Sequence, residues 1–186
     1  GSGKSTLLRL IMGLEEPDEG SIQIGKYNIF PSYFEQNQAE ALELDKTVIE
    51  TISQFVPSWT QTEMRSLLGS FGLTNESVFK DVSQISGGEK ARLALALMII
   101  KPSNLLILDE PTNHLDMFAK DILKHALKQY KGTVIIVSHD RDFLNGLAER
   151  VIEFDNKRVR EFPGDIDVYL NQNKESNILE DSSKVI

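Results

Sequence analysis

The chain opens on a short glycine-rich stretch that leads directly into an apolar helical run, and this feature limits its fold more than any other. Residues 1–6 read GSGKST, which matches the second half of the phosphate-binding pattern G-x-x-x-x-G-K-[S/T]. Small residues let backbone N–H groups crowd around phosphate oxygens, and the following helix directs its positive end at the anion. A plain glycine-rich helix cap is the alternative for these residues taken alone.

A nucleotide triphosphate is the ligand that this pattern predicts. Lys4 would reach the β- and γ-phosphates, and the Ser5 hydroxyl would bind Mg²⁺. The residues predicted to contact the nucleotide here are Gly1, Ser2, Gly3, Lys4, Ser5 and Thr6. The first glycine of the pattern and the strand that feeds it would precede residue 1, so we expect a longer parent chain.

Composition excludes several other classes. The 186 residues carry a net charge of −8, which should repel a phosphate backbone and argues against broad binding of nucleic acid by this segment. The absence of cysteine excludes disulfides and thiolate metal sites, and fits a reducing cytoplasm. No apolar run approaches the roughly 18 residues that cross a membrane. We expect a cytoplasmic protein.

Strands and helices alternate along the chain, which predicts an α/β fold with a parallel sheet. Strands are expected at residues 21–25, 28–34, 105–108, 133–137, 150–154 and 157–161. Helices are expected at residues 5–14, 47–56, 62–71, 90–100, 117–130 and 142–149, with Thr60 or Thr62 capping the third. We expect one domain over residues 1–170 and a polar tail over residues 171–186.

Polar clusters follow two of the apolar strands. Asp109 and Glu110 end the first, and ligands in such sheets bind beyond the carboxyl ends of the strands. We predict that Asp109 holds Mg²⁺, usually through water, and that Glu110 polarises the attacking water as a general base. Ser138-His139-Asp140 ends the second strand, although Ser138 and Asp140 could equally cap the next helix. The histidines lack metal-ligand spacing, so no zinc site is predicted.

Five motifs together resemble those of ATP-binding-cassette (ABC) ATPases. Residues 86–90, SGGEK before an Ala/Leu-rich helix, look like the signature motif, and residues 105–111, LLILDEP, look like Walker B. Residues 113–116 resemble the D-loop, His139 the switch histidine and Gln36 the Q-loop glutamine. The motifs fall in the family's order from residue 1 to about residue 165.

This resemblance implies a P-loop NTPase sheet with a helical signature subdomain at about residues 46–90 and part of an antiparallel β arm at residues 21–34. It implies that ATP with Mg²⁺ lies between two cassettes that close head to tail. The implied catalytic residues are Glu110, His139 and Gln36, and the implied metal ligands are Ser5, Gln36 and Asp109. The residues implied at the shared nucleotide site are Ser86, Gly87, Gly88, Glu89 and Asp116.

Within that superfamily the chain is most similar to ABC-F proteins, and to their second cassette. Residues 109–116 (DEPTNHLD), residues 137–144 (VSHDRDFL) and the ending FPGD before Tyr169 carry this resemblance. ABC-F chains are soluble, carry two cassettes and no membrane domain, and many act on the ribosome. The resemblance implies ATP-driven clamp closure on a ribosome-type partner, in translation or in antibiotic resistance, with RNA contacts made by segments not present here.

Three other functions remain open. The ATPase subunit of a membrane transporter has the same cassette chemistry. A chromosome-maintenance or break-repair ATPase also uses SGGEK, but it inserts a long coiled coil between the phosphate loop and the signature. A catalytically dead binding module is disfavoured because Lys4, Gln36, Asp109, Glu110 and His139 are all present.

Overall fold

The computed structural model describes residues 3–25, 27–34, 38–113, 115–155 and 158–171. Contacts divide the chain into two compact units, one formed by Ser5–Val137 and the other by Gly1–Lys4 with Ser138–Ile186. Each unit is described by itself. The polar tail expected from residue 171 onward lies outside the described residues except at its first position.

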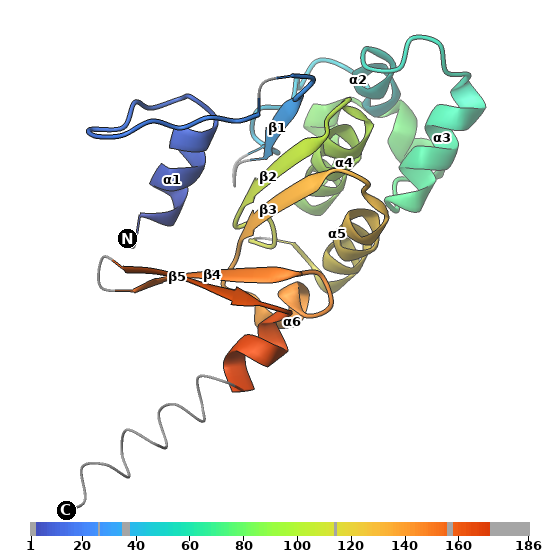
Figure 1. The fold of residues 1–186 in the computed structure, drawn as a ribbon. Coiled ribbons are helices and arrows are strands. Elements are labelled where there is room, and N and C mark those ends of the chain that lie inside the picture. The colour runs from blue at the N-terminus through green and yellow to red at the C-terminus, as the bar shows by residue number, and fades with distance from the viewer. Residues whose placement is uncertain (1–2, 26, 35–37, 114, 156–157, 172–186) are drawn as a thin grey trace, which may run out of the picture. The chain divides into compact units, whose positions relative to one another are not determined.

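A parallel sheet forms the centre of the Ser5–Val137 unit, as the alternation of elements predicted. Its order is β1 (Pro31–Phe34), β2 (Leu105–Asp109) and β3 (Thr133–Val137), and Figure 1 shows the three strands side by side. The first four residues of β2 are buried, as expected for a strand covered on both faces. The strand ends that carry the candidate site therefore lie at one edge of the sheet.

Asn104 fixes the register of all three strands at their starting ends. Its side chain accepts a hydrogen bond from the Phe30 N–H (2.8 Å) and donates one to the Asn28 carbonyl (2.6 Å). Its backbone carbonyl accepts from the Thr133 N–H (2.9 Å). Because each bond joins residues far apart in sequence, this single side chain and carbonyl hold β1, β2 and β3 in step.

Helix α1 (Lys4–Ile11) packs against one face of this sheet. Leu8 is buried with Leu105 and Ile107 of β2, and partly buried side chains surround them: Ile11, Met12, Ile24, Tyr33, Ile135 and Val137. Alternate residues of β2 point to the opposite face, so Leu106 and Leu108 fill the side on which α4 and α5 lie in Figure 1. The sheet is thus covered by helices on both faces.

Helix α4 (Gly87–Ile100) runs through the interior of this unit. Its residues 93–98 are all buried, so the helix is apolar around most of its circumference rather than along one stripe. Helix α5 (Met117–Gln129) packs beside it and presents Ala119, Leu123 and Leu127 to the core. Both elements lie close to the predicted ranges, although α4 begins three residues earlier than expected, at the glycine pair.

The region between β1 and α4 is helical, as predicted. It holds α2 (Val48–Ser53), α3 (Gln61–Ser70) and the 3₁₀ turns η1 (Asn75–Phe79) and η2 (Val82–Gln84). The starts of α2 and α3 share one device, a capping box in which a threonine hydroxyl and a glutamate three residues later satisfy each other's backbone N–H groups. Thr60, and not Thr62, caps α3.

The second unit contains α6 (Arg141–Leu144) and a hairpin of β4 (Arg150–Asp155) and β5 (Arg158–Pro163). A short helix follows at residues 166–171. The Asp165 carboxylate accepts hydrogen bonds from the Gly146 and Ile166 N–H groups, and the Tyr169 hydroxyl donates to Glu153. The FPGD…Y sequence therefore has a structural role in this unit, because it ties the hairpin to its neighbours.

The antiparallel arm implied at residues 21–34 is not found among the described residues of that range, because β1 pairs in parallel with β2 and the antiparallel pair is β4 with β5. Two sequence predictions of individual elements are also wrong. Residues 21–25 alternate like a strand but form no ladder with any described strand, and alternation alone does not make a strand without a hydrogen-bonded neighbour. The helix predicted at residues 142–149 ends at Leu144, because Gly146 adopts a left-handed backbone (φ 73°) and donates its N–H to Asp165. In the described part of the chain, no helix is long and apolar enough to cross a bilayer.

Candidate active site

Asp109 stands at the carboxyl end of β2 with one side-chain oxygen unsatisfied. Its Oδ1 is buried and has no hydrogen-bond partner among the described residues, while Oδ2 lies 3.5 Å from the Tyr33 hydroxyl. A buried carboxylate oxygen without a partner is costly, so this position favours a cation or a bound water. The described residues contain no group of three carboxylate, histidine or cysteine side chains suited to a metal. A cation held by few protein ligands, as Mg²⁺ commonly is, fits Asp109.

Glu110 adopts a backbone conformation that is rare for a residue with a side chain. Its φ is 49°, in the left-handed region, which costs a non-glycine residue about 1–2 kcal/mol. The Glu110 N–H donates to the Val137 carbonyl (2.8 Å), so the end of β3 holds the strained turn in place. Strain of this kind is kept where the surrounding structure enforces it, and such places are frequently functional.

The segment after Glu110 is a series of tight turns that ends at the start of α5. The Asn113 N–H donates to the Glu110 carbonyl (3.1 Å) and the Leu115 N–H to the Thr112 carbonyl (3.2 Å). Asp116 then caps α5 by accepting the Ala119 N–H (2.7 Å). Backbone hydrogen bonds thus join Glu110 to Asn113 and Thr112 to Leu115, the residue before Asp116.

Ser86 and Glu89 form the third capping box, at the start of α4. The Glu89 carboxylate accepts from the Ser86 N–H (2.9 Å) and hydroxyl (2.8 Å), and the Ser77 hydroxyl donates to its other oxygen (2.8 Å). Apart from its chain neighbours and the backbone of its own helix, no described atom lies within 4 Å of where a Cβ of Gly87 would be. Packing in this unit therefore does not require glycine at Gly87, and glycine weakens a helix. A backbone without a side chain at a helix start does, however, allow an anion to approach closely.

The hydrogen bonds of this box lower the pKa of Glu89 below its ordinary value of 4.5. The first cause is the Ser86 backbone N–H, and the two hydroxyl donors and the Arg92 charge act in the same direction against partial burial. Because the folded-state pKa is lowered, the charged carboxylate stabilises the fold above pH 4.5, and this contribution disappears as the pH falls through the folded value. The start of α4 should therefore be sensitive to acid.

We expect Glu89→Gln to destabilise the intact protein at pH 7 by about 0.5 kcal/mol, the usual size for a charge at a helix N-terminus. Glutamine keeps the shape of the capping box, so the difference reports the charge alone. Urea unfolding from pH 3 to pH 7 measures it, and the two proteins should converge at the acid end. A difference that stays constant over this range would show that the Glu89 charge is not the cause.

One cavity brings the glycine pair of α4 and Glu110 together. Its volume is about 390 Å³, and Gly87, Gly88 and Glu110 all line it. The other lining residues are Phe34, Ala39, Glu40, Ala91, Ala94, Pro111, Asn113 and Leu115. The structure therefore places the signature glycines and Glu110, which are more than 20 residues apart in the sequence, on the wall of one cavity.

The structure describes only some of the other residues that were predicted to form the site. Ser5 and Thr6 occupy the first turn of α1, and Gly3 has a left-handed backbone (φ 82°) before it. Gly1, Ser2 and Gln36 lie outside the described residues. Lys4 and His139 belong to the unit that does not contain Asp109 and Glu110, so the expected convergence of these four side chains stays a prediction.

The cluster that follows β3 includes a helix cap, which was one of the two readings left open. Asp140 caps α6 by accepting the Phe143 N–H (3.0 Å), and the Ser138 hydroxyl accepts the Asp140 N–H (3.0 Å). His139 lies between them and is exposed. The local hydrogen bonds thus fix the backbone on both sides of this histidine.

Sequence reasoning missed Tyr33 and Arg92. Tyr33 lies on the strand next to Asp109, and only the parallel pairing of β1 with β2 brings them together. Arg92 Nη1 lies 3.2 Å from Asp116 Oδ2, and the Arg92 side chain is only 15% exposed. A single arginine in the apolar run of α4 was the signal available in the sequence.

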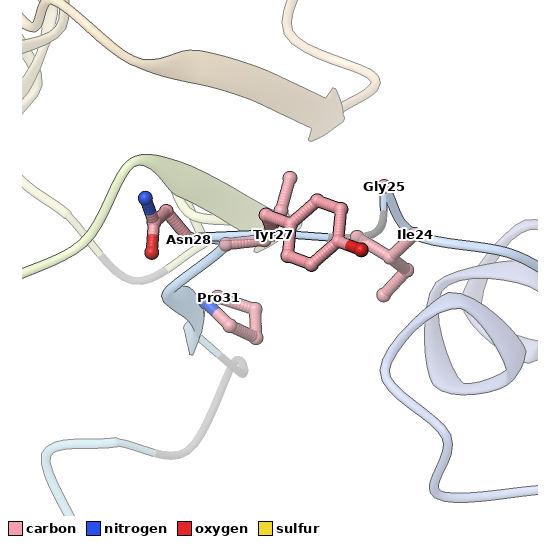
Figure 2. Close-up of a pocket in the computed structure, with 6 residues that line it drawn as sticks. Ile24, Gly25, Tyr27, Asn28 and Pro31 are labelled. Carbon is pink, nitrogen blue, oxygen red and sulfur yellow. The ribbon is translucent and has the colours of Figure 1, made fainter.

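A second hollow, of about 270 Å³, lies apart from these residues (Figure 2). It is lined by Ile24, Gly25, Tyr27, Asn28 and Ile29 from the connection between α1 and β1, and by Pro31 at the start of β1. Its described lining residues offer no carboxylate and no cationic group. We therefore assign it no part in the candidate site.

Comparison with known proteins identifies the family of the chain. A family model described as "ABC transporter" matches residues 1–113. ABC transporter F family member 2 of Arabidopsis thaliana is 49% identical over 180 residues, which cover 97% of this chain and 26% of that protein. The putative ATP-binding protein YdiF of Bacillus subtilis (strain 168) is 44% identical over 97% of this chain and 28% of its own length. The chain spans about a quarter of the length of the curated relatives it matches.

The fold is also found in solved structures. One is the complex of archaeal ribosomal stalk protein aP1 with the archaeal ribosome recycling factor aABCE1, which has a TM-score of 0.70 and 25% identity. The match covers 94% of this chain and 34% of that one. The parallel α/β sheet and the small antiparallel pair therefore agree with known ABC ATPase structures.

Proposed function

Since this chain belongs to the ABC transporter family of ATP-binding cassettes, we propose that it hydrolyses ATP in a pair with a second cassette of ABC-F type. The observation that supports ATP hydrolysis is the arrangement of Asp109 and Glu110 at the end of β2. There, a buried Asp109 oxygen has no partner among the residues that the structure describes, and the next residue, Glu110, is held in a strained turn beside a cavity. When water attacks a phosphate, a carboxylate must accept the proton of the water, and a cation must lie close by to neutralise the phosphate charge.

The residues of this chain divide the work of phosphoryl transfer between them. Lys4 and the backbone of residues 1–6 bind the phosphates, and Glu110 accepts the proton of the attacking water. Mg²⁺, when bound, supplies positive charge that neutralises the phosphate oxygens, and Ser5, Gln36 and Asp109 are the residues that would hold it. His139 orients the γ-phosphate side, a role that rests on the family resemblance.

A second cassette completes the site. The start of α4 offers an anion site at Ser86, Gly87 and Gly88 that the chain's own phosphate loop cannot use at the same time. We therefore assign these residues, with Glu89 and Asp116, to the ATP bound by the partner cassette. Hydrolysis then requires closure of the pair, and ATP acts as the clamp.

A ribosome-type partner in the cytoplasm is the target that fits best. The relative from Arabidopsis is named as an ABC-F member, and the matching solved structure is described as a ribosome recycling factor with a ribosomal stalk protein. The net charge of −8 argues that segments outside this cassette make the RNA contacts, whether the role is translation or ribosomal protection from antibiotics. The alternative is a transporter ATPase subunit.

Co-sedimentation with ribosomes tests this proposal in the intact protein. Glu110→Gln should stall hydrolysis with ATP bound, so this variant should pellet with ribosomes in ATP and remain in the supernatant in ADP. Glu40→Gln, which removes a carboxylate from the same cavity wall, serves as the matched control and should show no such trapping. Equal pelleting in ATP and ADP, or recovery with membranes instead of ribosomes, would contradict the ribosomal role.

A further inference from the structure

Arg92 lies at a junction of three segments in the Ser5–Val137 unit. Its Nη1 donates to Asp116 Oδ2 (3.2 Å), and the same Nη1 is 3.6 Å from where a Cβ of Gly88 would be. Its Nε is 3.6 Å from the corresponding position at Gly72, just beyond the end of α3. The guanidinium therefore bonds to the start of α5 and lies near two glycines, Gly88 of its own helix and Gly72 just after α3.

The Arg92 side chain is held there although its hydrogen bonding is incomplete. Its Nε is buried and has no hydrogen-bond partner among the described residues. A buried donor without a partner costs about 1–3 kcal/mol, so the surroundings of Nε do not explain where the guanidinium lies. The contact with Asp116 does explain it, because that carboxylate is the acceptor the guanidinium reaches.

Asp116 passes this constraint on to Glu110. Asp116 Oδ1 caps α5 while Oδ2 accepts from Arg92, so both of its oxygens are used. Backbone hydrogen bonds join Glu110 to Asn113 and Thr112 to Leu115, which precedes Asp116, so fixing Asp116 restricts the path of the chain back to Glu110. Arg92 thus links Gly88 and Glu110, which line the same cavity.

We propose that Arg92 is a positioning residue that holds the Glu110–Asp116 segment in register with the glycine pair of α4. Its role rests on the proposed ATPase function, because the segment it holds carries the general base. Arg92 itself touches no reacting atom. Loss of the link should misplace Glu110 and leave the phosphate-binding residues of α1 unchanged.

The kinetic test uses Arg92→Gln, Asp116→Asn and the double variant in the intact protein. Asparagine is as good a helix cap as aspartate, so Asp116→Asn removes the ion pair and keeps the cap. We expect each single variant to lower kcat for ATP hydrolysis by about tenfold, the scale of a small misplacement. KM for ATP should be unchanged in Arg92→Gln, and this variant is the one that reports KM, because Asp116 is itself assigned to the partner cassette's ATP. The double variant should be no slower than the single variants, because both remove one link. Multiplied effects, or a change in KM alone, would overturn the proposal.

Hydrogen–deuterium exchange at the backbone amides of residues 117–120 tests the link without requiring activity. Arg92→Gln should raise exchange there at least severalfold, while Lys128→Gln, which removes an exposed charge from the far end of α5, should not. If the intact protein hydrolyses no ATP, the proposed function fails and exchange alone decides the role of Arg92. Unchanged exchange in Arg92→Gln would refute the link whatever the activity.

Discussion

In the intact protein, Glu110→Gln should lower kcat for ATP hydrolysis by about 10²–10⁴-fold, the range attributed to a positioned general base. Glutamine keeps the size and the hydrogen-bonding reach of the side chain but cannot accept the proton of the attacking water. The nucleotide affinity should stay within about twofold, since Glu110 is not among the phosphate-binding residues. Phosphate release under saturating ATP measures the first quantity, and equilibrium titration with a fluorescent ATP analogue measures the second.

Glu40→Gln is the matched control for that prediction. It removes the same charge from the wall of the same cavity, yet Glu40 is exposed and belongs to no predicted motif. We expect its turnover to remain within about twofold of the parent protein. Normal turnover in Glu110→Gln would remove Glu110 as the base, and a parallel loss in both variants would point to the charge of the cavity instead.

Gly132→Ala should be among the most destabilising single substitutions in the sheet. A Cβ at this position would lie 2.5 Å from the Asn104 carbonyl oxygen and 2.8 Å from the Asn104 carbonyl carbon. These are backbone atoms that cannot swing aside, and the same carbonyl accepts the Thr133 N–H that starts β3. We expect a loss of about 3 kcal/mol in the free energy of unfolding, the upper part of the range for overpacking.

Gly69→Ala is the same chemical change, but we expect it to raise the free energy of unfolding rather than lower it. Gly69 lies inside α3, and no described atom is within 4 Å of where its Cβ would be. Alanine should stabilise the helix by about 0.5–1 kcal/mol, because glycine has a high conformational entropy in the unfolded chain. Urea unfolding of the two variants of the intact protein measures both signs, and destabilisation of equal size in both would contradict the clash at Asn104.

Elements with local causes were predicted well. The capped starts of α2 and α3, the apolar strands β2 and β3, and the helix α5 all depend on residues a few positions apart, and each lies within a few residues of its predicted range. The failures had distant causes. Residues 21–25 lacked a partner strand, and Gly146 ended α6 by bonding to Asp165, 19 residues away.

The candidate site divides in the same way. The sequence by itself determined the chemistry on offer: a phosphate loop before α1, carboxylates after β2 and an anion site at the start of α4. These follow from residue type and short spacing along the chain. They are also the motifs by which the family was recognised.

Only the tertiary structure decided how those groups are held. The unsatisfied Asp109 oxygen, the left-handed turn at Glu110 and the Arg92–Asp116 pair arise where separate elements meet. Arg92 and Asp116 are 24 residues apart, and Asp109 and Tyr33 are 76 apart. Contacts over such distances depend on packing and strand order, which the order of residue types along the chain does not encode locally. The sequence names the reacting groups, and the assembled sheet and helices set their geometry.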